Sequence, residues 1–136
     1  MIKLCKVRDI ILVKNYKSQG KEINKHSFVV LSDEHGKIHG LNYDIICSVM
    51  SSFKNDEQRK KKLEYPGNFP IAHNDSIIEN NDGIDGYIKA EQFYYFNKDK
   101  LDYIVMGELK EDVFNLVLDF IEDEMDCPIE QITDNL

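Results

Sequence analysis

The sequence contains few residues of the kinds that build disulfide or metal scaffolds. It has 3 Cys, 3 Pro and no Trp among its 136 residues. Cys5, Cys47 and Cys127 are odd in number and far apart, and no CxxC pair occurs. A disulfide framework and a zinc ribbon are therefore both disfavoured. This cysteine usage is typical of a reduced, cytoplasmic protein.

Motifs for membranes, nucleotides and metals are also missing. No apolar run approaches the roughly 18 residues that a membrane-spanning helix needs, and the first residues carry charges and lack a small-residue cleavage site. Neither GxGxxG nor GxxxxGK[ST] occurs, so a nucleotide-phosphate loop is unsupported. His35, His39 and His73 form no HExxH motif and no cluster at ligand spacing. We therefore predict no membrane association, no metal and no cofactor.

Composition indicates one globular domain over residues 1–136. Hydrophobic residues make up 42% and charged residues 31% of the chain, which suits a packed core with a solvated surface. The net charge of −8 is unevenly distributed. Residues 1–62 hold 13 Lys and Arg against 7 Asp and Glu, whereas residues 63–136 hold 4 against 18. The basic part can present a local patch that attracts nucleic acid, although the acidic part is equally well explained by solubility alone.

Short apolar segments with turn residues between them predict strands over most of the chain. The polar residues 15–25 predict a hairpin loop, and residues 53–70 begin as a charge cluster and end in an extended FPIA segment. The segment 76–96 predicts two short strands punctuated at 81–83, the second ending in the aromatic patch Phe93–Phe96. The other predicted strands cover 7–14, 26–34, about 42–51 and 103–109.

The hydrophobic period changes after Leu109. Apolar residues then recur at spacings of three and four, and acidic residues lie between them. This pattern predicts one amphipathic helix over about 110–125, which Pro128 ends, and residues 126–136 read as a loose tail. The apolar stripe comprises Leu109, Val113, Leu116, Val117, Phe120 and Ile121. Strands followed by one helix predict a mainly β, α+β domain: a small, bent antiparallel sheet or partial barrel with the helix packed against it.

Several segments, in this order, resemble the PemK/MazF family of toxin endoribonucleases. They are VRDIILV at 7–13, NKHSFVVLS at 24–32, IICSVMSS at 45–52, GYIKAEQFYYF at 86–96 and MGELKEDVFNLV at 106–117. The resemblance spans about residues 7–122. It implies an SH3-like antiparallel partial barrel with a C-terminal amphipathic helix, acting as a homodimer that a cognate antitoxin protein inhibits.

The resemblance also implies a chemistry. In that family a ribose 2′-OH attacks the adjacent phosphate without metal and displaces the 5′-oxygen of the next nucleotide, which leaves a 2′,3′-cyclic phosphate and a free 5′-OH. The reaction needs groups that take and give a proton and groups that stabilise the charged phosphorane. The family's Arg-Pro pair is replaced here by His26-Ser27, and Ser51 falls where the family has a hydroxyl residue. His26 titrates near neutral pH and can serve as general acid or base, so His26 and Ser51 are the predicted catalytic residues.

Neighbouring residues are candidates for binding single-stranded RNA. Lys25, Ser27, Ser52 and Arg59 are predicted to contact the substrate, and Ser52 or Ser48 would replace Ser51 if the strand register slips. The basic run 59–62 lies near Tyr65 and Phe69, and basic residues with aromatics suit single-stranded RNA. A charge run of this kind is, however, usually just a solvated surface.

Other residues favour structural roles. Glu91 and Gln92 fall on the family's Glu-Gln pair and are expected to hold the fold or the dimer together, and Cys47 is expected in the core. The exposed aromatic patch Phe93–Phe96 is interpreted as a dimer interface, unless its alternate members pack under the helix. Two alternatives to a nuclease remain open. One is a non-catalytic binding module on the same barrel that poisons a protein target, and the other is a phage or mobile-element accessory protein whose acidic half binds another protein.

Overall fold

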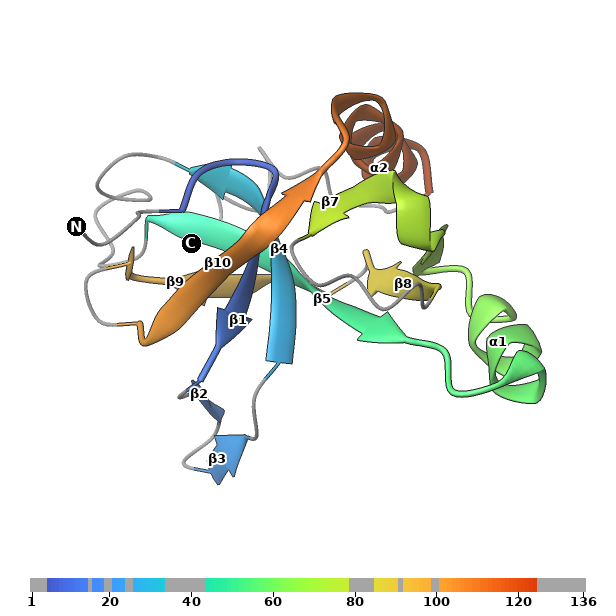
Figure 1. Cartoon of the computed structure of the whole chain (residues 1–136), viewed down its shortest axis with the longest axis horizontal. Coiled ribbons are helices and arrows are strands. Elements are labelled where there is room, and N and C mark those ends of the chain that lie inside the picture. Colours follow the sequence, from blue (N-terminus) through green and yellow to red (C-terminus); the bar gives the residue numbers. More distant parts are fainter. Residues whose placement is uncertain are drawn as a thin grey trace.

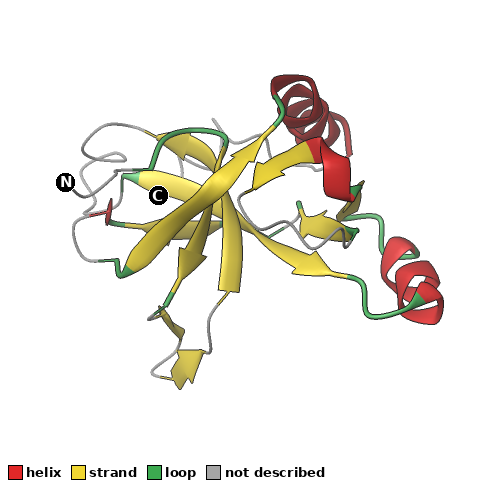
Figure 2. Ribbon diagram, viewed as in Figure 1, coloured by secondary structure: helices red, strands yellow, loops and turns green. Residues whose placement is uncertain are grey.

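The computed structural model describes residues 5–14, 16–18, 21–23, 26–33, 44–78, 85–90, 92–98 and 101–124 (Figure 1). Strands dominate, and the two α-helices lie outside the sheet (Figure 2). No helix in these ranges is long and apolar enough to cross a membrane. The elements are β1 (Asp9–Val13), β2 (Tyr16–Ser18), β3 (Lys21–Ile23), β4 (His26–Asp33), β5 (Ile45–Ser52), α1 (Asp56–Leu63), β6 (Asn68–Ile71), the 3₁₀ turn His73–Asp75, β7 (Ser76–Ile78), β8 (Gly86–Lys89), β9 (Tyr94–Phe96), β10 (Tyr103–Leu109) and α2 (Glu111–Glu124).

The main sheet is antiparallel, with strand order β6-β8-β5-β4-β1-β10-β7. The predicted mainly β domain with a C-terminal helix is therefore confirmed, and β10 has the predicted bounds. The two strands predicted around residues 81–83 do not pair with each other: β7 joins β10, whereas β8 lies between β5 and β6. Among the described strands, β6 and β7 form open ends of the sheet.

Strands β8 and β9 share one edge of β5. Met50 pairs with Ile88 in β8, and Cys47 pairs with Tyr94 in β9, so the two strands pair with β5 in different registers. Ser48 lies between these two paired stretches of β5 and is fully buried. Its hydroxyl donates a hydrogen bond to the Gln92 carbonyl at 2.9 Å, which gives β5 a polar partner where the ladder is interrupted.

The sheet separates two hydrophobic cores, because successive side chains of a strand point to opposite faces. One core lies under α2 and includes Val29, Ile88 and Leu109. The other is enclosed by β1, β4, β5, β9 and β10, and its centre is Phe28, whose ring contacts Phe96 edge-on at 5.1 Å. Both faces of the central strands are therefore buried.

Helix α2 confirms the predicted helix and corrects its apolar stripe. The side chains of Val113, Val117 and Ile121 are buried on the inner face of the helix, as predicted. Leu116 is 57% exposed, however, and Phe114, which was not in the predicted stripe, is buried. The buried face of the helix is therefore rotated from the predicted one, away from Leu116 and toward Phe114.

Helix α1 was not predicted from the sequence. It contains no buried residue and projects beyond the end of β5 (Figure 1). The Asn55 side chain accepts a hydrogen bond from the Gln58 backbone N–H at 2.8 Å, and Gln58 Oε1 accepts one from the Lys54 N–H. This cap, with acidic residues in the first turn and lysines in the last, stabilises a helix that has no apolar face.

The predicted hairpin loop contains a two-stranded ribbon, in which β2 pairs with β3 (Figure 1). The predicted turn at 81–83 and the predicted tail at 126–136 lie outside the described residues.

Candidate nucleic-acid interface

The end of β5 positions the predicted serines. Ser51 pairs with Tyr87 of β8, and Ser52 pairs with Gly86. Ser51 is partly buried, whereas Ser52 is exposed. A Cβ atom on Gly86 would overlap the Ser51 carbonyl oxygen, so the two strands approach each other here more closely than any other residue type would allow.

The start of β4 lies beside this end of β5. His26 pairs with Val13 of β1, and Ser27 pairs with Met50 of β5. One step beyond the Ser27–Met50 pair, β4 has His26 and β5 has Ser51. The backbones of His26 and Ser51 therefore lie at the same end of the β4–β5 pair. Ser27 shares a face with Met50, which packs toward the α2 core, whereas Ser51 belongs to the opposite face.

The predicted substrate-binding residue Lys25 and the side chain of the predicted catalytic residue His26 lie outside the described part of the structure. Ser48, the alternative hydroxyl, is fully buried and bonded to Gln92, so it has no access to a substrate.

Arg59 joins the interface through an aromatic pair that the sequence did not single out. The Phe53 ring stacks on Tyr87, with centroids 5.1 Å apart and planes at 28°. The Arg59 guanidinium carbon lies over the Phe53 ring at 5.7 Å from its centroid. Arg59 Nη1 also lies 3.7 Å from Asp85 Oδ2. These groups surround a shallow hollow of about 160 Å³ lined by Phe53, Lys54, Asn55, Asp56, Arg59 and Asp85.

Basic residues continue from this hollow along α1. Arg59, Lys60 and Lys61 are exposed, and Tyr65 just beyond the helix is 58% exposed. Phe69 is different, since it packs edge-on against Phe120 of α2 at 5.3 Å. Phe53 and Tyr65, rather than Phe69, are therefore the aromatic groups beside the basic run.

The residues missed by the sequence analysis are Phe53, Asp85 and Tyr87. Phe53 and Asp85 are distant in the chain, and only the β5–β8 register brings them together. Their backbones are joined by a hydrogen bond from the Phe53 N–H to the Asp85 carbonyl at 3.0 Å. The sequence near Phe53 offered one local signal, which concerned the start of helix α1. It is the helix-capping pattern in which Asn55 is followed three residues later by Gln58.

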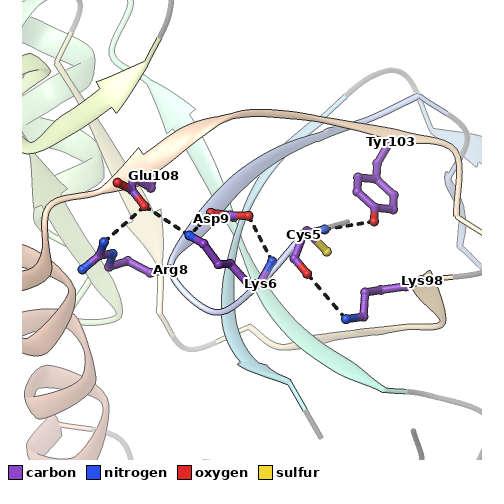
Figure 3. Close-up of polar contacts among 7 residues, drawn as sticks. All are labelled: Cys5, Lys6, Arg8, Asp9, Lys98, Tyr103 and Glu108. Carbon is purple, nitrogen blue, oxygen red and sulfur yellow. Dashed lines mark hydrogen bonds and ion pairs between the residues drawn. The ribbon is translucent and has the colours of Figure 1, made fainter. Parts of the chain in front are cut away.

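A polar network at the N-terminal turn is structural (Figure 3). Glu108 of β10 accepts hydrogen bonds from Arg8 at 3.2 Å and Lys6 at 3.3 Å, and the hydrogen bond from Arg8 is the main cause that lowers the pKa of Glu108. Lys6 also bonds the buried Asp9, and this bond raises the lysine pKa. The network fastens the turn before β1 to β10.

Lys98 makes a second buried contact near this turn. Its Nζ lies 2.7 Å from Asp33 Oδ2, with the two side chains 13% and 2% exposed. Burial acts to lower the pKa of Lys98, but the hydrogen bond and charge of Asp33 outweigh it and the pKa is raised. Lys98 Nζ also donates to the Cys5 carbonyl, and the Cys5 N–H donates to the Tyr103 hydroxyl (Figure 3).

The two described cysteines are free and buried. Cys47 belongs to the core, as predicted. Burial raises the pKa of the Cys47 thiol well above its usual value and also raises that of Cys5. Neither thiol is therefore suited to act as a nucleophile.

The aromatic patch at 93–96 is divided between the two cores. Phe93 packs toward the core under α2, while Tyr94 and Phe96 pack with Phe28 on the opposite face. Tyr95 is partly buried. The observation that suggested a dimer, a contiguous exposed aromatic surface, is thus not found here. Gln92 contributes to the fold through its carbonyl, and Glu91 lies outside the described residues.

Among the residues that the structure describes, no three or more His, Cys, Asp or Glu side chains are grouped as metal ligands would be. A scan against models of known protein families matches none of them. A search of curated proteins likewise returns no match. The similarity to the PemK/MazF family therefore stays a prediction from the residues alone.

Proposed function

We propose that this chain is a PemK/MazF-like toxin that cleaves single-stranded RNA in the cytoplasm without a metal ion. The core enclosed by β9, β5, β4, β1 and β10 supports an SH3-like partial barrel, since those strands surround Phe28 and its neighbours. The register shifts in the β1–β10 and β4–β5 pairs are of the kind that bends a sheet toward closure.

One observation carries the proposal. The strand register brings the start of β4 to the end of β5, where the basic helix α1 begins. His26 and Ser51 would thus work at the same place: His26 would exchange a proton with the 2′-OH or the leaving oxygen, and Ser51 would bond a phosphate oxygen. Lys25, Ser52 and Arg59 would hold the RNA backbone by charge and hydrogen bonds. Ser27, on the other face, is the weakest member of this set.

Incubation of the purified protein with a long unstructured RNA in EDTA tests the proposal. We expect cuts that leave cyclic phosphate ends. His26→Ala should lower the rate by about 10²–10⁴-fold, the usual range for general acid–base groups. Ser51→Ala should cost about 1.5–3 kcal/mol, as expected for a hydrogen bond to a charged oxygen.

The control is Asn115→Ala, an exposed substitution on α2 far along the chain from this interface, which should cut at the wild-type rate. Intact RNA after incubation with antitoxin-free wild-type protein would contradict the proposal. If the His26→Ala variant cut RNA at the wild-type rate, His26 would not be catalytic. Lys25 or Arg59 would then become the better candidate for the charge that faces the phosphate.

A non-catalytic binding module is the second candidate. The hollow beside Arg59 is lined by two carboxylates, Asp56 and Asp85, as well as by Lys54 and Arg59. Carboxylates repel phosphate. A hollow with equal numbers of acidic and basic side chains therefore favours a protein partner more than a purely basic groove would. Tight binding of a protein with no cleavage of varied RNAs would establish this candidate.

Inhibition by a cognate antitoxin and a homodimer belong to the first proposal. Sedimentation at micromolar concentration tests the dimer directly. A single species of 15.9 kDa would exclude it.

A further inference from the structure

The hollow at the end of β5 has a supported aromatic ring and a carboxylate side by side. Tyr87, beneath Phe53, is only 4% exposed. Arg59, over the same ring, has a side chain that is 48% exposed. The Phe53 ring therefore stacks on a buried residue, Tyr87, whereas the Arg59 side chain that lies over it is about half exposed to water.

Arg59 is held loosely enough to be displaced. Its 3.7 Å separation from Asp85 is longer than the roughly 2.7–2.9 Å of a charge-assisted hydrogen bond. Ion pairs between exposed side chains contribute little to stability. An RNA phosphate could therefore draw Arg59 away from the Phe53 ring, and a base could take its place. Planar bases stack on such rings in proteins that bind single strands.

The ring and the carboxylate are held in place by backbone. Phe53 and Asp85 lie opposite each other, one step beyond the Ser52–Gly86 pair, and their backbones share a hydrogen bond. The close approach of Gly86 to Ser51 fixes the strands immediately beside them. A ligand would meet these groups already in position, which reduces the entropy lost on binding.

We propose that this hollow binds one guanine base of single-stranded RNA, with the ring on Phe53 and the Watson–Crick edge on Asp85. This inference rests on the proposed function and names the base that its RNA would present. An ionised carboxylate only accepts hydrogen bonds. Guanine offers it two adjacent N–H donors, N1–H and the N2 amino group, whereas each other base places a carbonyl or a bare nitrogen beside its donor.

The size and charge of the site agree with a single base. A hollow of about 160 Å³ is smaller than the roughly 300–1,000 Å³ of pockets that enclose whole small ligands. The ribose and phosphates would therefore lie outside it. Lys54 lines the rim, and Lys60 and Lys61 are exposed on the adjoining helix, where phosphates would be attracted.

Binding of fluorescein-labelled 2′-O-methyl octamers tests the inference, because these oligomers lack the attacking hydroxyl and stay intact. The octamers are oligouridine with one central base, which is guanine, inosine, adenine, cytosine or uracil. We expect guanine to bind roughly tenfold or more tightly than uracil, in the range of one bidentate base contact. Inosine, which lacks the N2 amino group, should fall between them.

Variants separate the carboxylate from the ring. Asp85→Asn should abolish the guanine preference, so that the guanine and uracil octamers bind this variant equally. Phe53→Leu should weaken every octamer by roughly tenfold, the effect of losing one stacked base. Asp56→Asn is the matched control: it removes the other carboxylate of the hollow and should keep the full preference for guanine. Denaturation midpoints equal to wild type would show that Asp85→Asn and Asp56→Asn are folded.

The same octamers with free 2′-hydroxyls distinguish the two proposals. Cleavage without any guanine preference in binding would overturn this inference and leave the nuclease standing. A guanine preference without cleavage would support the site and overturn the nuclease. Equal binding of all five octamers, or a preference that survives Asp85→Asn, would overturn the site. Absence of both binding and cleavage would overturn both proposals.

Discussion

The absence of one side chain determines how closely two strands meet beside the candidate interface. Gly86 pairs with Ser52, and the Ser51 carbonyl occupies the space that a Cβ atom would need. The obstacle is backbone, which cannot rotate aside as the end of a long side chain can. The neighbouring groups, Phe53 and Asp85, depend on this contact for their separation.

Gly86→Ala is therefore expected to destabilise the protein by roughly 1–3 kcal/mol, as overpacking does. The measurement is the free energy of unfolding from a urea titration. Ser52→Ala, in the exposed residue opposite, is the control and should stay within about 0.5 kcal/mol of wild type. A Gly86→Ala variant as stable as that control would show that the strands can move apart at no cost.

At the scale of elements, the turn before β1 depends on β10. Arg8 has a φ of 82°, in the left-handed region that side chains rarely adopt. Its backbone N–H donates to the Val30 carbonyl and its carbonyl accepts from the Leu109 N–H. The guanidinium bonds Glu108, so an unfavourable backbone conformation is held by contacts on both neighbouring strands.

Glu108→Gln should lower the thermal midpoint at neutral pH, because Arg8 and Lys6 lose their ionised partner. The pKa of Glu108 is lowered in the folded protein, chiefly by Arg8. Its stabilising effect is thus complete above the ordinary glutamate pKa of about 4.3 and is lost as the pH falls through the lower folded value. Thermal melts between neutral and acidic pH check this: the difference from wild type should shrink on the acid side.

Glu122→Gln serves as the control, since Glu122 is exposed on α2. Its thermal midpoint at neutral pH should stay close to that of wild type. A Glu108→Gln difference that stays constant with pH would mean that the ion pairs do not fasten the turn.

The elements with a buried face were predictable from the sequence, and those without one were not. Strands β4 and β5 were found because their continuous apolar runs are buried, and helix α2 because its 3.6-residue apolar pattern reflects one buried face. Helix α1 buries nothing, so only its Asn55–Gln58 cap marked it. The contact of Phe53 with Asp85 follows from pairing between β5 and β8, and no local pattern records strand pairing. The positions of His26 and Ser51 at strand ends could be read from the apolar runs beside them.

At the scale of the whole molecule, the two cores cannot unfold independently. β4 supplies Phe28 and Val30 to one core and Val29 and Leu31 to the other. Loss of either core would expose side chains of a strand that the other core needs. We therefore expect one cooperative unfolding transition, with secondary and tertiary probes coincident.

Alkylation of Cys47 provides a measurement of that transition. The thiol is fully buried, and burial raises its pKa well above the usual value. At pH 8 its labelling by iodoacetamide should be slower than in the urea-unfolded chain by at least about 10³-fold, set by the fraction of unfolded molecules. Peptide mapping by mass spectrometry assigns the label. Fast labelling of Cys47 in the folded protein would reveal an opening of the Phe28 core that leaves the rest intact.

Burial of both faces of β4 has a consequence for how the chain finds its strand alignment. A slip of one residue exchanges the two sets of side chains, and since both sets are apolar, hydrophobicity alone rejects the slip only weakly. Asp33 at the end of the strand does discriminate. In the native alignment its carboxylate meets Lys98 at 2.7 Å, and a slip would carry it to the other face. Leaving such a buried charge without its partner costs about 3–5 kcal/mol. The ion pair thus selects the alignment of β4, and an Asp33→Leu/Lys98→Met variant should refold to a mixture of conformers, visible as doubled amide resonances, while the wild type gives one set.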